Sequence, residues 1–249
     1  MHKKGEGDLH NNIGIKVPEI MLPNKAVDVN KWSIIACDQY TSNRDYWHRV
    51  KKYVGDAPST LDLVYPEVYL EDSDNDLRIK SISKAMRDYI SEGLLTRLTP
   101  QFIYTERTIS SGELRRGLIV ALDLEQYDYN AGASSLIRAT EGTVLDRLPP
   151  RIAIRREAIL ESPHIMVLYD DPNHNVIEPL SAHVSEMNKL YDFKLMMNSG
   201  HITGYGVSEK TTIDDILSAL GQLAEPDVFM KKYNVDESKP IMLFAVGDG

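Results

Sequence analysis

An arginine-rich stretch in the middle of the chain is the clearest concentration of side chains suited to binding an anion. The arginines of positions 138–156 are Arg138, Arg147, Arg151, Arg155 and Arg156. A guanidinium offers planar, forked donors that match a phosphate or a carboxylate. Pro149 and Pro150 are typical of a helix start, which would place Arg151 and Arg155 one turn apart on one face. The N–H groups at that helix start would add to an anion site.

The same arginines have a purely structural interpretation. Glu157, Glu161 and other surface acids are close in the sequence and could pair with them. Exposed ion pairs of this kind are common and contribute little to stability. The spacing alone leaves both interpretations open.

The last residues of the chain form a second candidate site. An apolar run, Ile241–Val246, leads directly into Gly247-Asp248-Gly249. In α/β sheets, ligands bind beyond the carboxyl ends of strands, and glycine allows tight turning there. We therefore expect Asp248 to be presented at a strand end. Because a buried strand is an unusual place to finish, we also expect the chain to be truncated after Gly249.

Other segments with unusual composition favour structural roles. Ser199–Gly206 holds three glycines but lacks the spacing of a phosphate-binding loop, so a hairpin with bends is expected. The acidic run near positions 71–76 is typical of a solvated loop before a helix rather than a metal site. No two histidines have the i, i+4 spacing of a helical zinc site, so no zinc site is predicted.

The hydrophobic pattern predicts a mixed arrangement of helices and strands. Ser33–Cys37 reads as a short buried strand with Cys37 as a buried thiol, followed by a loop that carries Asp38. The expected helices are 45–54, a long one ending at Gly93, one after Pro149, 181–191, 213–223 and one after Pro226. The expected strands include 61–70 as an extended segment, a hairpin of 102–109 with 114–124, 164–169, 202–207 and 241–246. This order predicts an α/β or α+β fold with a mixed sheet and flanking helices.

Composition narrows the classes of protein. The 249 residues carry a net charge of −9, which disfavours broad binding to nucleic acids or anionic membranes. The single cysteine rules out a disulfide framework and fits a reducing compartment. No window approaches the roughly 18 apolar residues of a membrane span. We expect a cytoplasmic protein that binds a small molecule.

Four motifs in order resemble the bacterial domain-of-unknown-function family 1015. They are Ala36–Tyr40 (ACDQY), Leu63–Glu67 (LVYPE), Ala139–Thr143 (ATEGT) with Asp146-Arg147, and Phe244–Gly249 (FAVGDG). The resemblance covers essentially the whole chain, which implies a single domain over 1–249. Thr140 stands where the family has a histidine, and the histidine that the family has after the last motif is absent.

The last motif also resembles a loop of the ParB/sulfiredoxin superfamily, which implies that fold elements of that superfamily are present. That superfamily includes nucleotide hydrolases and an ADP-dependent free-serine kinase, in which the loop leads into a helix whose N-terminus holds phosphate. This more distant resemblance implies a nucleotide-binding phosphotransferase or nucleotide hydrolase. ADP or ATP with magnesium would then be the cofactor.

The leading hypothesis is therefore a nucleotide- or phosphate-binding enzyme that transfers a phosphoryl group to a small molecule. Glu141 or Asp248 would act as base or metal ligand, and Asp38 would bind substrate. The predicted phosphate-binding residues are Arg138, Thr143, Arg147 and Arg151. The alternative hypothesis is a non-catalytic module that binds a ligand or a partner protein. DNA binding, which some ParB relatives show, is disfavoured by the net charge.

Overall fold

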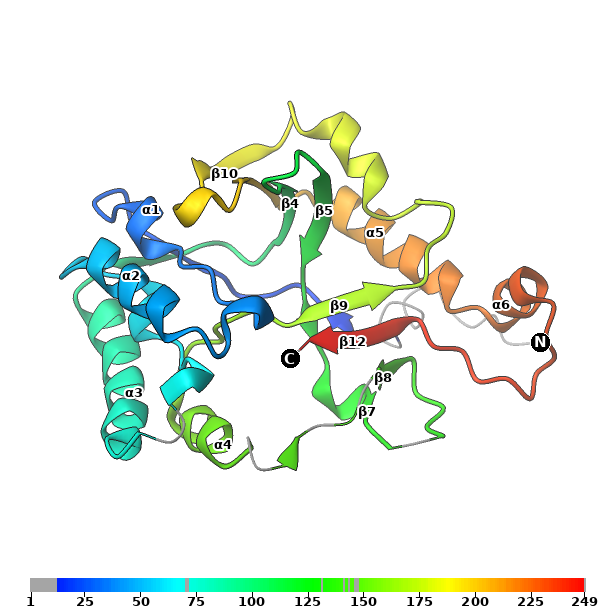
Figure 1. Ribbon diagram of the computed structural model, residues 1–249. Coiled ribbons are helices and arrows are strands. Elements are labelled where there is room, and N and C mark those ends of the chain that lie inside the picture. Colours follow the sequence, from blue (N-terminus) through cyan, green and yellow to red (C-terminus); the bar gives the residue numbers. More distant parts are fainter. Residues whose placement is uncertain are drawn as a thin grey trace.

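The computed structural model shows a mixed α/β protein of the α+β kind (Figure 1). It describes residues 13–69, 72–130, 132–140, 142, 144–145 and 148–248, with positions 38, 75 and 248 described by their backbone. Two four-stranded sheets and two short strand pairs form its β structure. The fold class predicted from the sequence is confirmed.

The first sheet is antiparallel throughout and has the order β10-β11-β4-β5. Its strands are β4 (Phe102–Thr108), β5 (Leu114–Ile119), β10 (Asn188–Lys194) and β11 (His201–Val207). The predicted hairpin is the β4–β5 pair, with Ile103 opposite Ile119 and Thr108 opposite Leu114. The glycine-rich segment forms β11, which pairs with both β10 and β4, so its structural interpretation is confirmed.

The second sheet is mixed and has the order β7-β8-β12-β9. Its strands are β7 (Tyr127–Asp128), β8 (Ile137–Ala139), β9 (Met166–Tyr169) and β12 (Phe244–Asp248). In this sheet β12 is parallel to β8 and antiparallel to β9. The short pairs are β1 (Ile15–Lys16) with β6 (Ala121–Leu122) and β2 (Met21–Pro23) with β3 (Leu95–Arg97).

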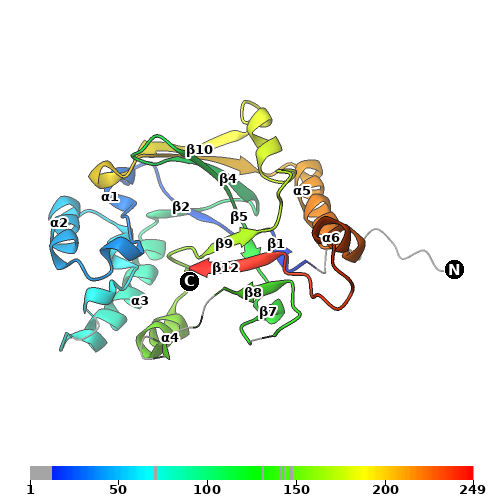
Figure 2. The same ribbon diagram turned by 45° about the vertical axis from the view of Figure 1, so that its right-hand side comes forward.

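Helices gather at two ends of the molecule (Figures 1 and 2). One group is α1 (Val29–Trp32), α2 (Arg44–Val54), α3 (Asn75–Ser91) and α4 (Leu148–Glu157). The other group is α5 (Lys210–Leu223) and α6 (Pro226–Tyr233). The side chain of Asn43 accepts a hydrogen bond from the Tyr46 N–H at 2.9 Å, which caps α2, and Gly55 follows its last turn. Pro226 opens α6 as predicted.

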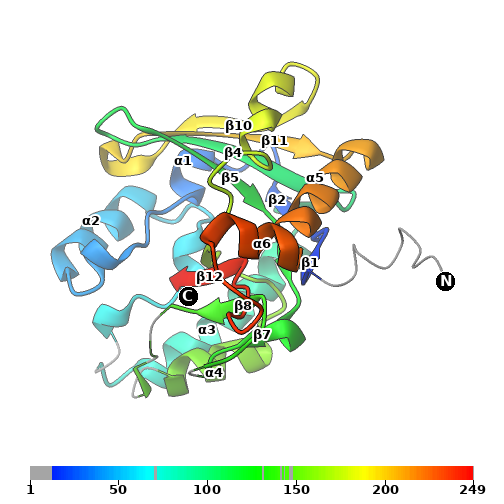
Figure 3. The same cartoon turned by 90° about the vertical axis from the view of Figure 1, so that its right-hand side faces the viewer.

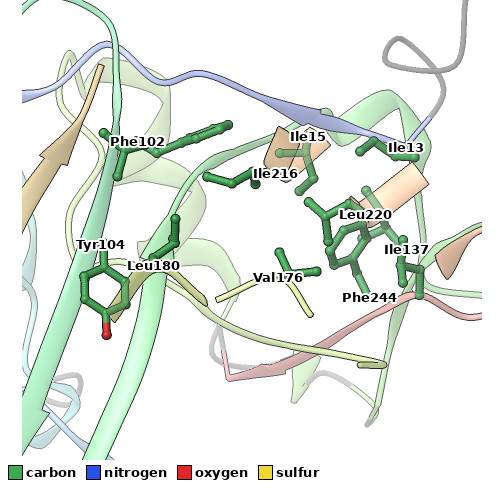
Figure 4. Close-up of a cluster of buried hydrophobic side chains, with 12 residues drawn as sticks. Ile13, Ile15, Phe102, Tyr104, Ile137, Val176, Leu180, Ile216, Leu220 and Phe244 are labelled. Atoms are coloured by element: carbon green, nitrogen blue, oxygen red, sulfur yellow. The ribbon is translucent and has the colours of Figure 1, made fainter. Parts of the chain in front are cut away.

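The main hydrophobic core joins both sheets to α5 (Figure 4). Phe102 and Tyr104 of β4 are fully buried, and they belong to the same cluster as Phe244 of β12 and Leu220 of α5. Burying one side chain of this size contributes about 1.5–3 kcal/mol. Burial raises the pKa of Tyr104 to about 12, and its hydroxyl donates to Glu106 at 2.8 Å. The core therefore fixes the mixed sheet against the antiparallel one.

Three predicted elements were wrong. Residues 33–37 form no strand, and Cys37 is exposed. Side chains satisfy this backbone in place of a neighbouring strand, because the Ile34 N–H donates to Thr60 Oγ1 at 3.3 Å and the Tyr46 hydroxyl donates to the Ile35 carbonyl at 2.5 Å. The described part of the segment predicted as extended, residues 61–69, contains 3₁₀ turns on either side of Pro66, at 60–62 and 67–69. The helix expected at 181–191 is a 3₁₀ turn, Glu178–His183, followed by β10. Pairing of β10 with β11 overrides its local helix propensity.

Two glycines with nearly the same φ angle provide a test of how β11 packs against β4. Gly112 has φ +91 and Gly200 has φ +96, so alanine would be strained at both. A Cβ at Gly112 would meet nothing, whereas a Cβ at Gly200 would overlap the carbonyl oxygen of Thr108. Urea unfolding should show a loss of about 1–2 kcal/mol for Gly112→Ala and about 3–5 kcal/mol for Gly200→Ala. Equal losses would contradict the packing of β11 against β4.

Candidate functional site

Two parallel strands, β8 and β12, end side by side (Figures 1 and 3). Ile137 is paired with Phe244 and Ala139 with Val246, although the two strands lie far apart in the sequence. Both strands therefore deliver the residues that follow them to the same edge of the sheet. Such an edge is where ligands bind in many α/β sheets.

Thr140 ties these two strand ends together. Its hydroxyl donates to the Val246 carbonyl at 2.7 Å, and its N–H donates to the same oxygen at 3.2 Å. The segment that carries the ATEGT motif therefore starts against the segment that carries the final Gly-Asp-Gly. These two motifs stood out in the sequence independently of each other. The fold brings Thr140 of the first motif into contact with Val246, the residue that precedes Gly-Asp-Gly.

The register of β12 shifts where the candidate motif begins. Val246 is paired with Val167, but Asp248 is paired with Met166, so Gly247 lies in a bulge. A bulge turns the following side chain and ends regular pairing, and such features occur often beside functional sites. A Cβ at Gly247 would come no closer than 3.8 Å to Met166, so packing does not require glycine there.

The predicted site residues have different outcomes. Glu141, Thr143 and Arg147 lie outside the described residues. Asp248 ends β12, two residues after Val246, and its backbone is paired with Met166 of β9. Asp38 begins a 3₁₀ turn, Asp38–Tyr40, in the connection between α1 and α2. The carboxyl end of β12 points toward the part of the molecule that α2, α3 and α4 form (Figures 1 and 2).

Arg138 does not reach this strand end. One of its terminal nitrogens donates to the Ala133 carbonyl at 2.6 Å and the other to the Pro240 carbonyl at 3.3 Å. Ala133 precedes β8 and Pro240 precedes β12, so the guanidinium lies toward the amino ends of both strands. The structure therefore places the guanidinium of Arg138 away from the carboxyl ends of β8 and β12.

Two arginines of α4 have carboxylate partners. Arg151 forms an ion pair with Glu67, and Arg155 forms one with Glu161. Pro149 and Pro150 lie in the first turn of α4, as predicted. The structural interpretation therefore accounts for these two arginines in this conformation. Arg151 remains half exposed.

The turn that carries Asp38 is held firmly against α2. Tyr40 stacks on Tyr46 with ring centroids 3.7 Å apart, and the Trp47 indole donates to the Tyr40 carbonyl at 3.0 Å. Burial raises the pKa of Tyr46, which keeps its hydroxyl protonated as a donor. Beside this turn lies an open depression of about 620 Å³ at the start of α2, lined by Gln39, Ser42, Asn43, Arg44 and Asp45.

The acidic run before α3 forms ion pairs. Asp72 accepts hydrogen bonds from Arg44, which lowers the pKa of its carboxyl group, and Asp74 pairs with Arg78 at 3.0 Å. Among the residues described, no three His, Cys, Asp or Glu side chains gather closely enough to share a metal ion.

The sequence-based reasoning missed a set of residues near the amino end of β12. The Tyr233 hydroxyl donates to Asp170 at 2.6 Å, and Lys232 forms an ion pair with the same carboxylate at 2.9 Å. This hydrogen bond to Asp170 is the main cause of the raised pKa of Tyr233. Phe229 lies four residues before Tyr233, and this spacing on one helix face was the available signal.

The fold gives the class of the protein, and comparison with known proteins gives its family. The fold and strand-end arrangement define a mixed α/β protein with a loop-bearing sheet edge. The profile of the family described as "Protein of unknown function (DUF1015)" matches residues 21–249, and the chain belongs to this family. No curated protein matched significantly, and neither did any solved structure. Within the described ranges, none of the helices has both the length and the apolar character needed to cross a bilayer.

The contact between Thr140 and Val246 can be tested directly. Thr140→Val removes the hydroxyl donor and keeps the branched shape, so the free energy of unfolding should fall by about 0.5–1.5 kcal/mol. Thr140→Ser keeps the donor and serves as the control. Urea unfolding measures both. A Thr140→Val protein as stable as the wild type would show that this bond does not hold the strand ends.

Proposed function

We propose that the protein is a nucleotide- or phosphate-binding enzyme that transfers a phosphoryl group between a nucleotide and a small molecule. The supporting observation is the contact of Thr140 with Val246, which starts the ATEGT segment and the Gly-Asp-Gly segment from one sheet edge. Phosphoryl transfer depends mainly on positioning and on charge stabilisation, so converging loops with acids and arginines suit it.

Each predicted residue has a role in this proposal. A hydroxyl oxygen of the small molecule attacks the terminal phosphorus, and the P–O bond to the leaving nucleotide breaks. Glu141 or Asp248 would take the hydroxyl proton or hold Mg²⁺, while Arg147 and Thr143 would bind phosphate oxygens. Asp38 binds the small-molecule substrate. Magnesium commonly binds through one or two carboxylates and the substrate phosphates, so a cluster of three ligands is not required.

The structure changes how the remaining arginines enter the proposal. Arg151 takes part only if phosphate displaces or joins its partner Glu67. Arg138 is left out, because its guanidinium lies toward the other end of the strands. The distant resemblance to the ParB/sulfiredoxin superfamily supports ADP or ATP as the nucleotide and a free-serine-kinase-like reaction.

Calorimetry tests the proposal. Titrating the protein with ADP, ATP and CTP, with and without Mg²⁺, should give saturable binding for at least one of them. Asp248→Asn and Arg147→Ala should each weaken that binding about tenfold or more, since each removes a charge-assisted contact. Absence of binding for all three nucleotides would refute the nucleotide proposal.

Matched variants control for changes in folding. Asp76→Asn alters an exposed acid in the first turn of α3, and Arg156→Ala alters an exposed arginine at the end of α4. Both should bind nucleotide as the wild type does. Thermal unfolding of all four variants shows whether each is folded, so that a loss of binding can be assigned to the altered contact.

A second candidate function is a non-catalytic module that binds a ligand or a partner protein. The ion pairs of Arg151 and Arg155 favour it, because they give a structural role to two arginines of the stretch 138–156, the arginine island. In this case Arg147→Ala and Asp248→Asn should both support growth in a complementation assay of the deleted gene. Loss of growth with either folded variant would exclude the module and favour the enzyme.

A further inference from the structure

The outer face of the mixed sheet is open on the side away from the core. Arg138, Ala245 and Leu168 are paired across β8, β12 and β9, so their side chains share one face. Their neighbours Ile137, Phe244 and Tyr169 share the opposite face, where Ile137 and Phe244 belong to the main core and Tyr169 packs against it. Leu168 is 57% exposed. On β7 the row continues with Asp128, which is paired with Arg138, so the outer face carries apolar side chains, one arginine and, at its β7 edge, one acid.

A hollow of about 500 Å³ lies over this face beside α6, and we name it the α6 groove. Its main lining residues are Arg138, Leu168, Phe229, Tyr233, Met242 and Ala245. α6 lies beyond the amino end of β12, on the side away from the C-terminus (Figures 1 and 3). The groove is therefore separate from the strand-end site, and an inference about it does not rest on the proposed function. Its volume falls in the range of small-molecule pockets, roughly 300–1,000 Å³.

Arg138 brings a positive charge to the groove, whereas the acid paired with it in the sheet, Asp128, accepts hydrogen bonds from Asn130 and does not line the groove. Within the described part of the chain, Arg138 has no carboxylate within ion-pair distance, and its buried Nε has no hydrogen-bond partner. Its two bonds go to main-chain carbonyls, which accept hydrogen bonds but carry no formal charge. Asp170 at the rim is already paired with Lys232. The groove therefore favours an anion, even though the whole chain has a charge of −9.

The walls of the groove suit a flat apolar group. The rings of Phe229 and Tyr233 lie 5.0 Å apart at an angle of 56°, and Leu168 and the 38% exposed Met242 line the groove with them. Aromatic faces stack on flat ligands, and methionine adapts its shape to them. The hydroxyl of Tyr233 donates a hydrogen bond to Asp170, and this hydrogen bond positions the ring at the rim of the groove.

We propose that the α6 groove binds a small amphipathic anion, such as an aromatic carboxylate or sulfonate. The flat apolar body lies against Leu168, Phe229 and Tyr233, and the anionic group lies at Arg138. This arrangement takes the exposed apolar surface out of water and places a counter-charge beside the guanidinium.

Two dyes of matched shape test the proposal. 8-Anilinonaphthalene-1-sulfonate has a flat body and one negative charge, and N-phenyl-1-naphthylamine has the same body without the sulfonate. The sulfonate dye should bind the native protein saturably at one site, with increased fluorescence. Arg138→Gln should weaken the sulfonate dye about tenfold and leave the neutral dye almost unchanged. Equal weakening of both dyes would assign Arg138 a structural role only and overturn the proposal.

Substitutions at Leu168 keep the test valid if Arg138→Gln does not fold. Leu168→Gln removes apolar contact, and Leu168→Glu also adds a repelling charge, so Leu168→Glu should bind the sulfonate dye at least several-fold more weakly than Leu168→Gln. Leu124→Glu, at a 73% exposed position outside the groove, should bind it as the wild type does. Equal binding by all three variants would place the dye elsewhere.

Size-exclusion chromatography tests the competing occupant of this face. The proposal expects that Leu168→Glu leaves the elution volume of the protein unchanged. A dimer that Leu168→Glu converts to a monomer would overturn the proposal, because a second copy would then cover the groove.

Discussion

The parallel pairing of β12 with β8 is the constraint on which the rest of the structure depends. It joins two segments from the middle and the end of the chain, and it does so inside the core, where Ile137 and Phe244 are both buried. Because these side chains share a cluster with β4 and α5, the strand pair cannot shift without opening the main core. That register also fixes the positions of Thr140 and Val246. Val246 is the last residue of β12 that is paired with β8, and Thr140 directly follows the last paired residue of β8.

A single sheet thus offers two chemically different surfaces. At the carboxyl ends of β8 and β12, polar loops with acids and a threonine start from adjacent backbone. At the amino ends, the outer face carries apolar side chains and the guanidinium of Arg138, which donates to two main-chain carbonyls. Side chains alternate between the two faces of a strand, so Ile137 can anchor the core while Arg138 next to it faces outward.

The arginine island shows how tertiary structure divides a continuous stretch of sequence. Arg138 belongs to a strand and donates to the nearby Ala133 carbonyl and the distant Pro240 carbonyl, whereas Arg151 belongs to a helix and pairs with Glu67, far away in the sequence. Only local acids such as Glu161 were visible as partners in the sequence, and Arg155 does pair with that residue. Close spacing in the sequence therefore did not mean a common site.

The sequence by itself determined the elements whose periodicity is strong: the helices that became α2, α3, α5 and α6, the β4–β5 hairpin, and the final strand. It also marked the ATEGT and Gly-Asp-Gly segments as motifs that resemble the family to which the chain belongs. Only the tertiary structure decided the fate of residues 33–37, whose backbone is satisfied by Thr60 and Tyr46, and of β10, which is a strand because β11 pairs with it. It alone decided where the guanidinium of Arg138 points and that α6 lies beyond the amino end of β12, beside the outer face of the sheet. These outcomes depend on contacts between residues distant in the chain, and no local pattern of residue types encodes such contacts.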